Sequence, residues 1–571
     1  TGTLRALDRV ISPEVVLTPD LTALIDAVAT RYAGTFSDVA RAAIPPRHAR
    51  AEAVPVERAT VVAPDPSPDA WGRYAGGPAL IGRIRAGTAR EVRGAWSAAP
   101  AHPWIDDIAD ALRAQLARPR GGAIVVVPDA FDVDRLAQAL TDCRETVAIL
   151  TADLGPERRY REFCRVLRGG ARIVLGTRGA VFAPMPDLEL LVVWDDANDL
   201  LWEPHAPYWN ARDVAALRAH LTGCTLLVGA PARSTEVEQW CETGWARSLA
   251  VQRAIVRETG PVVRAIEPGD LARDEAARTA RIPRIAWQVA KEGVRTGPVL
   301  IQVARRGYLP SLACQACRTP ARCACGGPLQ RRGGARIIQC GWCGTPTTTW
   351  RCPACSATEL RALTVGVERT AEEFGRAFPG ERIIWSAGEQ IVRSIGPEAA
   401  IVVATPGAEP IASAGYAAGV ILDARAQLAR PSMRALEDAA HRWFAAGMLL
   451  RPKAHLLIVA DAGSLPVQAL TRWDAPWLAE RELTDRASAG LPPVTRAAVL
   501  RGRPADIAAV LATLTVPHRA LGPVDDRAFV LVSRDHATDL ARELRAITVT
   551  RSARASDAPV TVAMDPHALD A

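Results

Sequence analysis

Short hydrophobic runs bounded by turn residues recur along most of the chain. Each run is a continuous stretch of Leu, Ile and Val, without the apolar–polar alternation of a half-exposed strand. Such runs are typical of strands buried on both faces, and therefore of parallel sheets covered by helices. They predict strands at 123–129, 172–177, 188–196, 225–231, 297–304, 382–387, 399–406, 418–424 and 455–462.

Helical segments, such as 105–118 and 433–450, lie between these runs, so the pattern indicates two α/β units. In the carboxyl-terminal region strand-like and helical segments alternate over shorter lengths, which predicts a small α+β domain. The first 50 residues predict two helices, and a following stretch rich in Pro, Ala and charge predicts a linker. The segments concerned are strands at 496–502, 528–534 and 559–566, helices at 504–515, 535–547, 19–33 and 36–43, and the linker at 51–75.

Eight of the twelve cysteines fall between Cys314 and Cys355, in four closely spaced pairs. Two thiolates in one short turn can bind the same metal, so four pairs supply the ligands of two tetrahedral four-cysteine zinc sites. Spacing alone does not show which two pairs share a metal, so three pairings of the four pairs stay open. The pairs are Cys314 and Cys317, Cys323 and Cys325, Cys340 and Cys343, and Cys352 and Cys355; the second is one residue shorter than a usual zinc knuckle.

Two other interpretations of the cysteines are weaker. A disulfide framework is disfavoured, because the rest of the chain is poor in cysteine and nothing marks it as secreted. A redox CxxC motif would explain one pair and leave three. The remaining cysteines are scattered and predict buried thiols: Cys143, Cys164, Cys224 and Cys241.

Charge and hydropathy narrow the class of protein only modestly. The formal net charge is +7, and all but two of the 69 basic residues are arginines. Arginine suits phosphate recognition, although an arginine- and alanine-rich composition also follows from GC-rich coding. No apolar run reaches the ~20 residues that a membrane span needs. We therefore expect a cytoplasmic protein without membrane contact.

Several segments resemble one known family. They include "LDRVISPEVVLTPDL" near the start, "VVVPD" (125–129), "GTRGAVFAP" (176–184), "VGVERTAEEFGRAFPG" (365–380) and "AMDP" (563–566). The most specific is "ARRGYLPSLACQAC" (304–317), which leads into the cysteine cluster. In these motifs the chain resembles the bacterial replication-restart primosomal protein family PriA.

The resemblance implies an α/β fold with two RecA-like helicase lobes, each built on a parallel sheet. A double-zinc module would be inserted in the second lobe, just after its first strand, and a small α+β domain would end the chain. The family's zinc sites are nested, so Cys314, Cys317, Cys352 and Cys355 would bind one zinc and Cys323, Cys325, Cys340 and Cys343 the other. The expected domains are 1–50 (remnant of a 3′-DNA-binding domain), 51–75 (linker), 76–250 (lobe 1), 251–310 with 361–470 (lobe 2), 311–360 (zinc module) and 471–571 (carboxyl-terminal domain).

Members of this family are ATP-driven helicases, but the chemistry of ATP hydrolysis needs residues that are absent here. A phosphate-binding loop has the pattern GxxxxGK[ST], whose lysine neutralises the phosphate oxygens. The two lysines, Lys291 and Lys453, do not follow a glycine. At the expected position, residues 91–104 read "EVRGAWSAAPAHPW", in which Pro100 and Pro103 each remove a backbone donor.

The other ATP motifs are altered in the same way. An acidic box, usually DEEH, reads "WDDAND" (194–199), where Asp195 and Asp196 are remnants of the magnesium ligand and the catalytic acid. We therefore predict no catalytic residues and no tight binding of ATP with Mg²⁺. The remaining replacements are "APA" at 230–232 for the coupling motif SAT, and "HRWFAAGM" at 441–448, with Ala445 and Met448 where the family has two arginines.

Candidate nucleic-acid contacts cluster around the zinc module. Arginines are placed to bind phosphates and two aromatic residues to stack on exposed bases. The competing interpretation is that an arginine-rich chain has such residues everywhere. The candidates are Arg305, Arg306, Tyr308, Arg331, Arg332 and Trp342.

The sequence thus predicts a DNA-binding primosome-assembly protein that restarts stalled or collapsed replication forks without helicase activity of its own. By resemblance, its partners would be forked or single-stranded DNA, single-strand-binding protein, other primosome components and the replicative helicase or its loader. One alternative is an active ATP-dependent 3′–5′ DNA helicase of the same family. Another is a zinc-ribbon protein of transcription or RNA metabolism.

Overall fold

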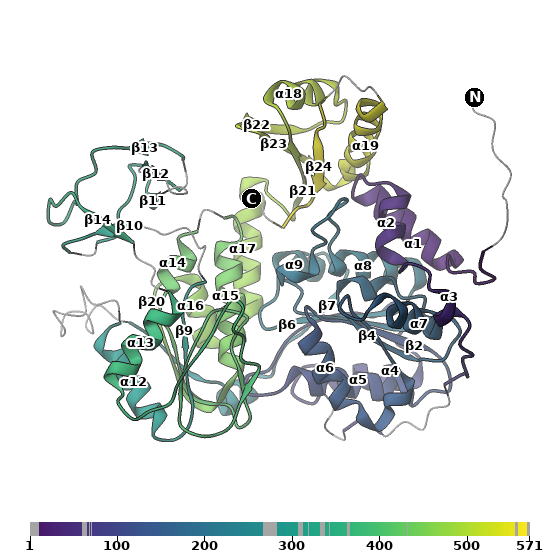
Figure 1. The fold of residues 1–571 in the computed structure, drawn as a ribbon, viewed down its shortest axis with the longest axis horizontal. Helices are drawn as coiled ribbons and strands as arrows, with labels where there is room; N and C mark the ends of the chain where they lie inside the picture. Colours follow the sequence, from purple (N-terminus) through teal and green to yellow (C-terminus); the bar gives the residue numbers. More distant parts are fainter. Residues whose placement is uncertain are drawn as a thin grey trace.

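The structure is a computed structural model, and Figure 1 shows its ribbon. It describes residues 11–59, 65–67, 69, 71–266, 282–305, 312–317, 319–331, 337–341, 343–362, 366–430, 432–553 and 558–567.

Lobe 1 is built on a seven-stranded sheet in which every neighbouring pair is parallel. The strand order is β3-β4-β2-β5-β6-β1-β7. The central strands are buried along their whole length, as the continuous apolar runs predict. The strands are β1 (Arg93–Ser97), β2 (Gly122–Val126), β3 (Val147–Leu150), β4 (Ile173–Gly176), β5 (Leu188–Trp194), β6 (Thr225–Ala230) and β7 (Arg247–Leu249).

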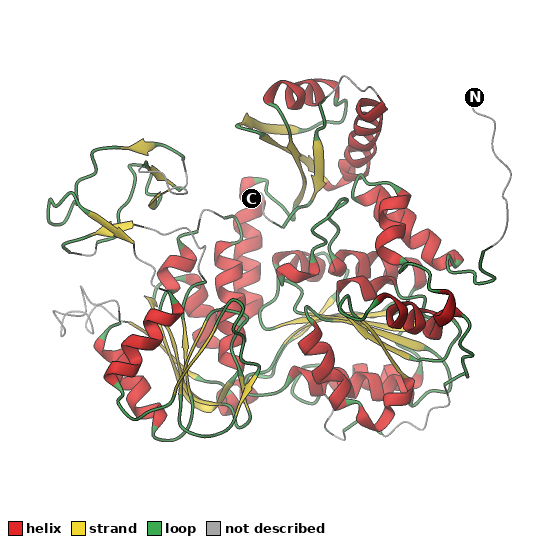
Figure 2. Ribbon diagram, viewed as in Figure 1, coloured by secondary structure: helices red, strands yellow, loops and turns green. Residues whose placement is uncertain are grey.

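Helices cover both faces of this sheet, each over its own apolar cluster (Figures 1 and 2). One face packs against α4 (Gly77–Ala86), α5 (Trp104–Leu116) and α6 (Ala130–Ala139). The other packs against α7 (Pro156–Leu167), α8 (Ala211–Thr222) and α9 (Thr235–Glu242).

Lobe 2 repeats the plan with a six-stranded parallel sheet in the order β15-β17-β9-β19-β20-β8. Two helices cover one face and three cover the other. The strands are β8 (Val262–Ile266), β9 (Val299–Gln302), β15 (Ile383–Ser386), β17 (Ile401–Ala404), β19 (Tyr416–Ile421) and β20 (Leu450–Asp461), and the helices are α12 (Arg284–Val294) and α13 (Val367–Ala377), then α14 (Ala424–Leu428), α15 (Ala435–Met448) and α16 (Leu465–Arg472). Helix α10 (Arg253–Thr259) lies between the two sheets in the chain, and the short strands β16 (Ser394–Ile395) and β18 (Ile411–Ala412) pair beside lobe 2.

The cysteine-rich segment follows β9 and projects from lobe 2 (Figure 1). The expectation that it follows the first strand of that sheet is wrong, because β8 precedes β9 in the chain. Strand β8 lies at the edge of the sheet, carries Arg264, and exposes 43% of Val262, so it has no continuous apolar signal. The segment contains the strands β10 (Leu312–Cys314), β11 (Leu329–Arg331), β12 (Ile338–Cys340), β13 (Pro346–Thr347) and β14 (Leu360–Ala362), in two small antiparallel sheets.

The carboxyl-terminal region is a four-stranded antiparallel sheet, ordered β22-β23-β21-β24, with two helices. Helix α17 (Ala475–Ala489) leads into it and packs against α9 of lobe 1. The elements are β21 (Thr495–Arg501), α18 (Pro504–Thr513), β22 (Arg519–Val524), β23 (Arg527–Ser533), α19 (Ala537–Ala553) and β24 (Thr561–Met564).

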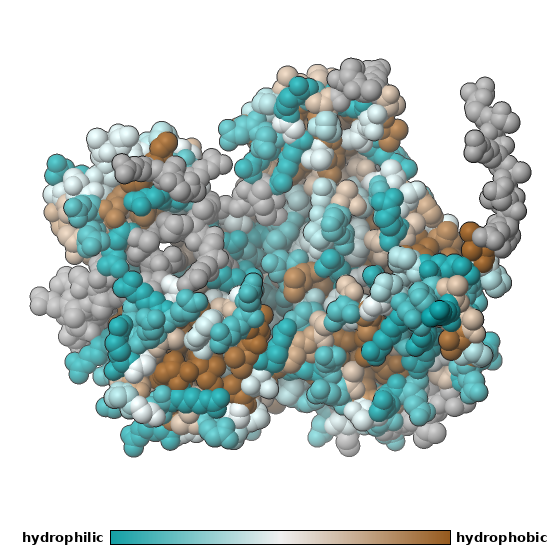
Figure 3. All heavy atoms as spheres, viewed as in Figure 1, coloured by the Kyte–Doolittle hydropathy of each residue, from teal (hydrophilic) through white to brown (hydrophobic). Residues whose placement is uncertain are grey.

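Near the amino terminus the chain forms α1 (Pro19–Arg31), α2 (Phe36–Ala43) and α3 (Ala49–Glu52). Helix α1 packs against both α8 and α19. One apolar cluster therefore runs from the amino-terminal helices through lobe 1 into the carboxyl-terminal domain. On the face shown in Figure 3 most of the surface is hydrophilic, with apolar patches on lobe 2 and near the amino-terminal segment.

The fold class predicted from the sequence is confirmed: two parallel-sheet lobes, an inserted cysteine module and an α+β carboxyl-terminal domain. The sequence interpretation missed strands β1, β3, β7, β8 and β22, which are short or lack a β-branched run. None of the described helices combines the length and the apolar character needed to cross a bilayer.

Candidate metal centres and nucleotide cleft

The eight clustered cysteines form two separate groups of four, and within each group all sulfur atoms lie within 4.8 Å of one another. In a tetrahedral site with Zn–S bonds of about 2.3 Å, neighbouring sulfurs are about 3.8 Å apart. The observed separations are close to this value: 3.5 Å for Cys314 and Cys355, 3.4 Å for Cys317 and Cys352, 3.8 Å for Cys323 and Cys343, and 3.5 Å for Cys325 and Cys340. Both groups therefore fit a tetrahedral thiophilic metal, and the nested arrangement is the one that the resemblance implies.

Each pair is held by the same backbone turn. The amide of Cys340 donates to the carbonyl of Thr345, five residues on, at 2.9 Å, and the amides of Cys314 and Cys352 do likewise to Thr319 and Ala357. In the short pair, the amide of Cys323 donates to Gly327, only four residues on, at 2.8 Å. The missing residue thus shortens the turn and leaves both sulfurs in place. Gly326 and Gly344 have φ of 84° and 71° in these turns, a conformation that glycine adopts without strain.

Two threonines prepare the cysteines for metal binding. The hydroxyl of Thr319 lies 3.2 Å from the sulfur of Cys317, and that of Thr345 lies 3.1 Å from the sulfur of Cys343. These side-chain hydrogen bonds, with the backbone amides of the same threonines, lower the pKa of each thiol to about 6. Backbone hydrogen bonds alone would lower the pKa of Cys355 and of Cys325, but hydrogen bonds to neighbouring sulfurs raise both to about 12, so within each group one thiol ionises readily and another does not. The thiolate is the form that binds a metal.

The apolar core of the module is small, so we expect its fold to depend on these centres. Among the described residues its buried cluster consists of Leu312, Ala321, Leu329 and Cys340, far short of what an independent unit needs. Chelation of the metal should therefore unfold the module alone, with rapid amide exchange in β10–β14 and unchanged exchange in the two large sheets.

Substitution should change the metal content in whole steps. Cys340→Ser removes a buried ligand, so bound metal should fall from two ions per chain to one, measured by a colorimetric chelator on the denatured protein. Cys241→Ser, outside the module, is the matched control and should retain two. Two ions bound to Cys340→Ser would contradict the assignment.

The turn between β1 and α5 stands where a helicase lobe carries its phosphate-binding loop, and here several of its backbone groups already have protein partners. The amide of Ala99 donates to the hydroxyl of Tyr74 at 3.2 Å, and the indole of Trp473, from lobe 2, donates to the carbonyl of Ala98 at 3.2 Å. Helix α5 follows Pro103, which has no amide hydrogen to offer.

A buried carboxylate reinforces this closure. Asp107, in the first turn of α5, has no exposed surface, accepts a hydrogen bond of 2.7 Å from Tyr74, and pairs with Arg73 at 2.6 Å. The positive end of a helix dipole normally attracts phosphate, but here it already faces a carboxylate. Indole rings pack between α5 and the sheet: Trp104, at the start of α5, stacks on Trp194, at the end of β5, with 4.4 Å between ring centroids.

The two acidic remnants at the end of β5 have protein partners. Asp195 accepts from Asn198 at 2.6 Å and pairs at 2.8 Å with His441, on α15 of lobe 2. Asp196 is 1% exposed and accepts a hydrogen bond from Ser234. Burial raises the pKa of Asp196 to about 6, against the opposing effect of Arg212.

The segment that would carry the arginines of the last helicase motif instead contributes contacts between the lobes. Met448 packs against apolar residues of both lobes. His441, seven residues earlier, makes the ion pair with Asp195. Sequence reasoning missed His441 as a partner, although it stands in the very motif that was compared with the family.

The His441–Asp195 pair should make stability depend on pH. Burial alone would lower the pKa of His441, but Asp195, followed by Asp196 and Asp438, raises it from 6.5 to about 9. A raised folded-state pKa stabilises the protein fully below pH 6.5, and this contribution disappears as the pH rises through 9. The difference in melting temperature between the wild type and His441→Gln should therefore be largest near pH 6 and shrink by about pH 10. His220→Gln, at an exposed side chain on α8, should follow the wild type at every pH.

The predicted nucleic-acid contacts are only partly described. Arg305 is exposed beyond the end of β9, and its Nε donates to the carbonyl of Pro406 at 2.8 Å. Arg331 is exposed on β11. Arg442, which the sequence interpretation did not single out, lies close enough to Arg305 that burial and this neighbour lower its pKa to about 10. Arg306, Tyr308, Arg332 and Trp342 lie outside the described residues.

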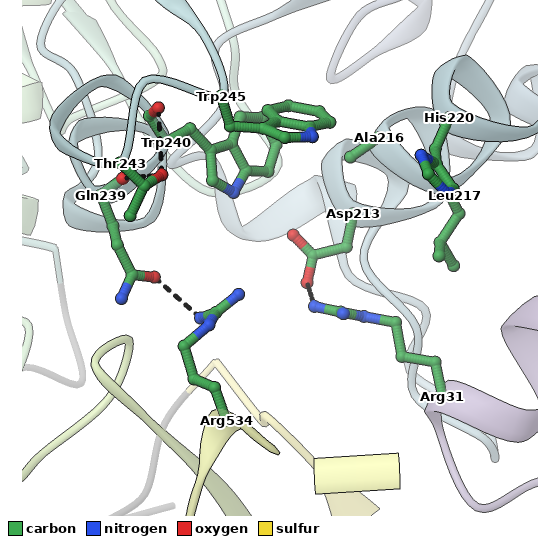
Figure 4. Close-up of a pocket in the computed structure, with 10 residues that line it drawn as sticks. All are labelled: Arg31, Asp213, Ala216, Leu217, His220, Gln239, Trp240, Thr243, Trp245 and Arg534. Carbon is green, nitrogen blue, oxygen red and sulfur yellow. Dashed lines mark hydrogen bonds and ion pairs between the residues drawn. The ribbon is translucent and has the colours of Figure 1, made fainter. Parts of the chain in front are cut away.

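A pocket of about 280 Å³ opens where α1, lobe 1 and the carboxyl-terminal domain meet (Figure 4). The indoles of Trp240 and Trp245 form one side, with ring centroids 4.8 Å apart. Arg31 pairs with Asp213 at 2.9 Å, whereas Arg534 donates to the neutral side chain of Gln239 at 2.7 Å and has no ion pair with any described residue. Its lining comes from positions 31 to 534, so no local motif predicts it.

Comparison with known proteins assigns the chain. No family model matches it. A protein of Mycobacterium tuberculosis (strain ATCC 25618 / H37Rv), described as "Probable replication restart protein PriA", is 44% identical over 604 aligned residues, which cover 99% of this chain and 92% of the relative.

The chain belongs to the PriA family.

More distant PriA proteins match over shorter stretches. The Bacillus subtilis protein is 22% identical over 268 residues, which cover 46% of this chain and 33% of that protein. A solved structure of RecG bound to a three-way DNA junction covers 81% of this chain and 52% of that protein, at 10% identity and a TM-score of 0.40. The strong similarity to mycobacterial PriA thus spans both lobes, the cysteine module and the carboxyl-terminal domain.

Proposed function

We propose that this protein is a replication restart factor that binds forked DNA and assembles the primosome without hydrolysing ATP. The observation that carries the first part is the 44% identity to a mycobacterial replication restart protein over 99% of the chain. It would act in the cytoplasm, at the nucleoid.

The second part, the absence of ATP hydrolysis, rests on the chemistry of the cleft. A phosphate chain would need a lysine and free backbone amides at the β1–α5 turn, and it would meet the Asp107 carboxylate instead. A magnesium ion would need Asp195 and Asp196, which bond to His441 and Ser234. Each requirement fails for a separate reason, so a single compensating change would not restore the activity.

We further propose that the metal in both four-cysteine groups is zinc. Four thiolates in tetrahedral array are the ligand set of structural zinc sites, and the sulfur separations suit that geometry. The metal would supply folding energy to the module and hold its basic surface in position, since the donor set leaves no open ligand position for catalysis.

DNA would contact the basic edge between lobe 2 and the zinc module. Arg305 is exposed beyond the end of β9, with Arg442 as a basic neighbour, and Arg331 is exposed on the module. Exposed guanidinium groups suit bidentate contacts with phosphate.

Single-strand-binding protein and the replicative helicase or its loader are the expected protein partners. The pocket in Figure 4 is the candidate surface for one of them. The indole faces of Trp240 and Trp245 suit an apolar side chain, and Arg534 suits a carboxylate, so the pocket favours an acidic segment with an apolar residue.

Parallel assays on the full chain test the proposal. We expect tight binding of forked DNA, no ATP hydrolysis above background with or without DNA, and no unwinding. Addition of ATP should leave the fork affinity unchanged. DNA-stimulated hydrolysis that Asp196→Asn abolishes would instead establish an active helicase. Preference for RNA over forked DNA would favour the zinc-ribbon alternative.

Charge reversal tests the proposed DNA edge. Arg305→Glu should weaken fork binding and reduce the slope of log K against log salt by about 1, because one phosphate contact is lost. Arg331→Glu should act in the same way. Arg369→Glu is the control, at a side chain of lobe 2 that is 72% exposed on α13. Equal slopes for all three variants and the wild type would place the DNA elsewhere.

A further inference from the structure

The two lobes meet through a buried group of charged and polar side chains, here called the interlobe hub: Thr235, Glu236, Arg434, Glu437 and Arg486. Thr235 and Glu236 open α9 of lobe 1. Arg434 and Glu437 lie at the start of α15 in lobe 2, and Arg486 lies on α17. The hub thus joins the amino-terminal ends of one helix from each lobe.

Every member of the hub bonds across or around the interface. Arg434 pairs with both Glu236 of lobe 1 and Glu437 of its own lobe. The carboxylate of Glu437 accepts from the amide of Thr235 at 3.3 Å and from Arg486 at 2.8 Å. Arg486 also donates to the hydroxyl of Thr235 at 2.7 Å. Removing any one partner would leave a charge or a donor unsatisfied.

Most of the hub is shielded from water, so breaking its contacts would cost free energy. Thr235, Arg434, Glu437 and Arg486 are at most 7% exposed. Burial alone would raise the pKa of Glu236, but Arg434 and Arg212 hold it well below its ordinary value. A buried ion pair tolerates separation poorly, because each charge is then left in a medium that does not solvate it.

Three further contacts join the lobes away from the hub. His441 of lobe 2 pairs with Asp195 at 2.8 Å. The indole of Trp473 donates to the carbonyl of Ala98. Arg393 of lobe 2 stands 4.9 Å from the ring centroid of Phe131 and 3.9 Å from Asp129.

These contacts share one location on lobe 1. Ala98 follows β1, Asp129 follows β2, Asp195 follows β5 and Thr235 follows β6 after a short loop. The carboxyl ends of all four strands therefore touch lobe 2. In an open α/β sheet this edge is where a ligand binds. Here the other lobe occupies it.

The carboxyl-terminal segment fastens the same interface. The Nε of Arg434 donates to the carbonyl of His567 at 2.8 Å, and the ring of His567 lies 4.5 Å from that of Trp202 in lobe 1. Asp565 pairs with Arg496, at the start of the carboxyl-terminal sheet. A third domain thus holds both sides of the hub.

We propose that the two lobes form one permanently closed body, whose spacing is fixed by protein contacts where a helicase motor would close on a nucleotide. This goes beyond the proposed function, because it concerns how the lobes move and not what they bind. A closed body presents its DNA-binding edge in a single geometry. Binding of a fork would therefore require no conformational step in the lobes and would be insensitive to nucleotide.

Amide hydrogen exchange and small-angle scattering on the full chain test this. The wild type should show strong protection of α9, α15 and the β1–α5 turn. Its radius of gyration should not change on addition of magnesium with a non-hydrolysable ATP analogue, or of ATP itself. A compaction with either nucleotide, or two populations of lobe spacing, would overturn the proposal.

Substitution of the hub sharpens the test. Glu437→Gln keeps the shape but removes the charge that Arg434 and Arg486 share, so exchange in α9 and α15 should accelerate by about tenfold or more. Asp485→Asn, at the exposed residue beside Arg486 on α17, is the matched control and should exchange like the wild type. Exchange in Glu437→Gln at the rate of the wild type would contradict a closure held by the hub.

A second variant covers the case in which Glu437→Gln does not fold. Arg393→Ala removes a partly exposed contact at the far side of the interface, and it should accelerate exchange only near α6. Unchanged exchange near α6 would show that the Arg393 contact does not help to hold the lobes together. Fork binding and ATP hydrolysis measured in parallel separate the two proposals. Loss of DNA binding with closed lobes would reject the proposed function alone, and a change of lobe spacing with nucleotide but without hydrolysis would reject the closed body alone.

Discussion

Buried pairs between arginine and carboxylate set the arrangement of this protein. They connect elements that are distant in sequence: Arg31 on α1 pairs with Asp213 on α8, and Arg434 of lobe 2 pairs with Glu236 of lobe 1. Arg212, 2% exposed, links Asp213 to Glu236 and so joins these pairs into one network. Because a buried charge is stable only when its partners are complete, the amino-terminal helices, both lobes and the carboxyl-terminal domain are constrained together. The planar guanidinium, with several donors, suits such shared contacts better than lysine does.

The same network explains why the acidic residues of the nucleotide cleft have protein partners. Asp196 stands where a helicase has its catalytic acid, but its neighbours are Ser234 and Arg212, members of the buried network. Asp195 forms an ion pair with His441 of the opposite lobe. Both carboxylates that would bind magnesium and activate water therefore have protein partners. These contacts are the structural basis for the proposal that the protein does not hydrolyse ATP.

The module of eight cysteines follows a different physical logic. Among its described residues the apolar cluster is small, so we expect its order to depend on metal coordination. The lobes, by contrast, have large cores and a charged interface between them. Metal removal and disruption of the hub should therefore affect separate parts of the molecule.

The sequence alone determined what depends on local pattern. Continuous apolar runs predicted buried parallel strands, and the four cysteine pairs predicted two metal sites, because backbone turns and side-chain spacing are short-range properties. The sequence also showed directly that the lysine of a P-loop is absent. The pairing of the cysteines came from family resemblance, since spacing leaves three possibilities.

The tertiary structure decided what depends on distant residues. No motif places Tyr74 and Asp107 over the β1–α5 turn, His441 beside Asp195, or Arg534 opposite Trp240. Strand β1 itself was missed, because Arg93–Ser97 contains no β-branched residue and owes its conformation to burial between β6 and β7. Contacts between domains decide which of these polar side chains meet. The physical reason is that burial and charge pairing act through space, after the chain has folded.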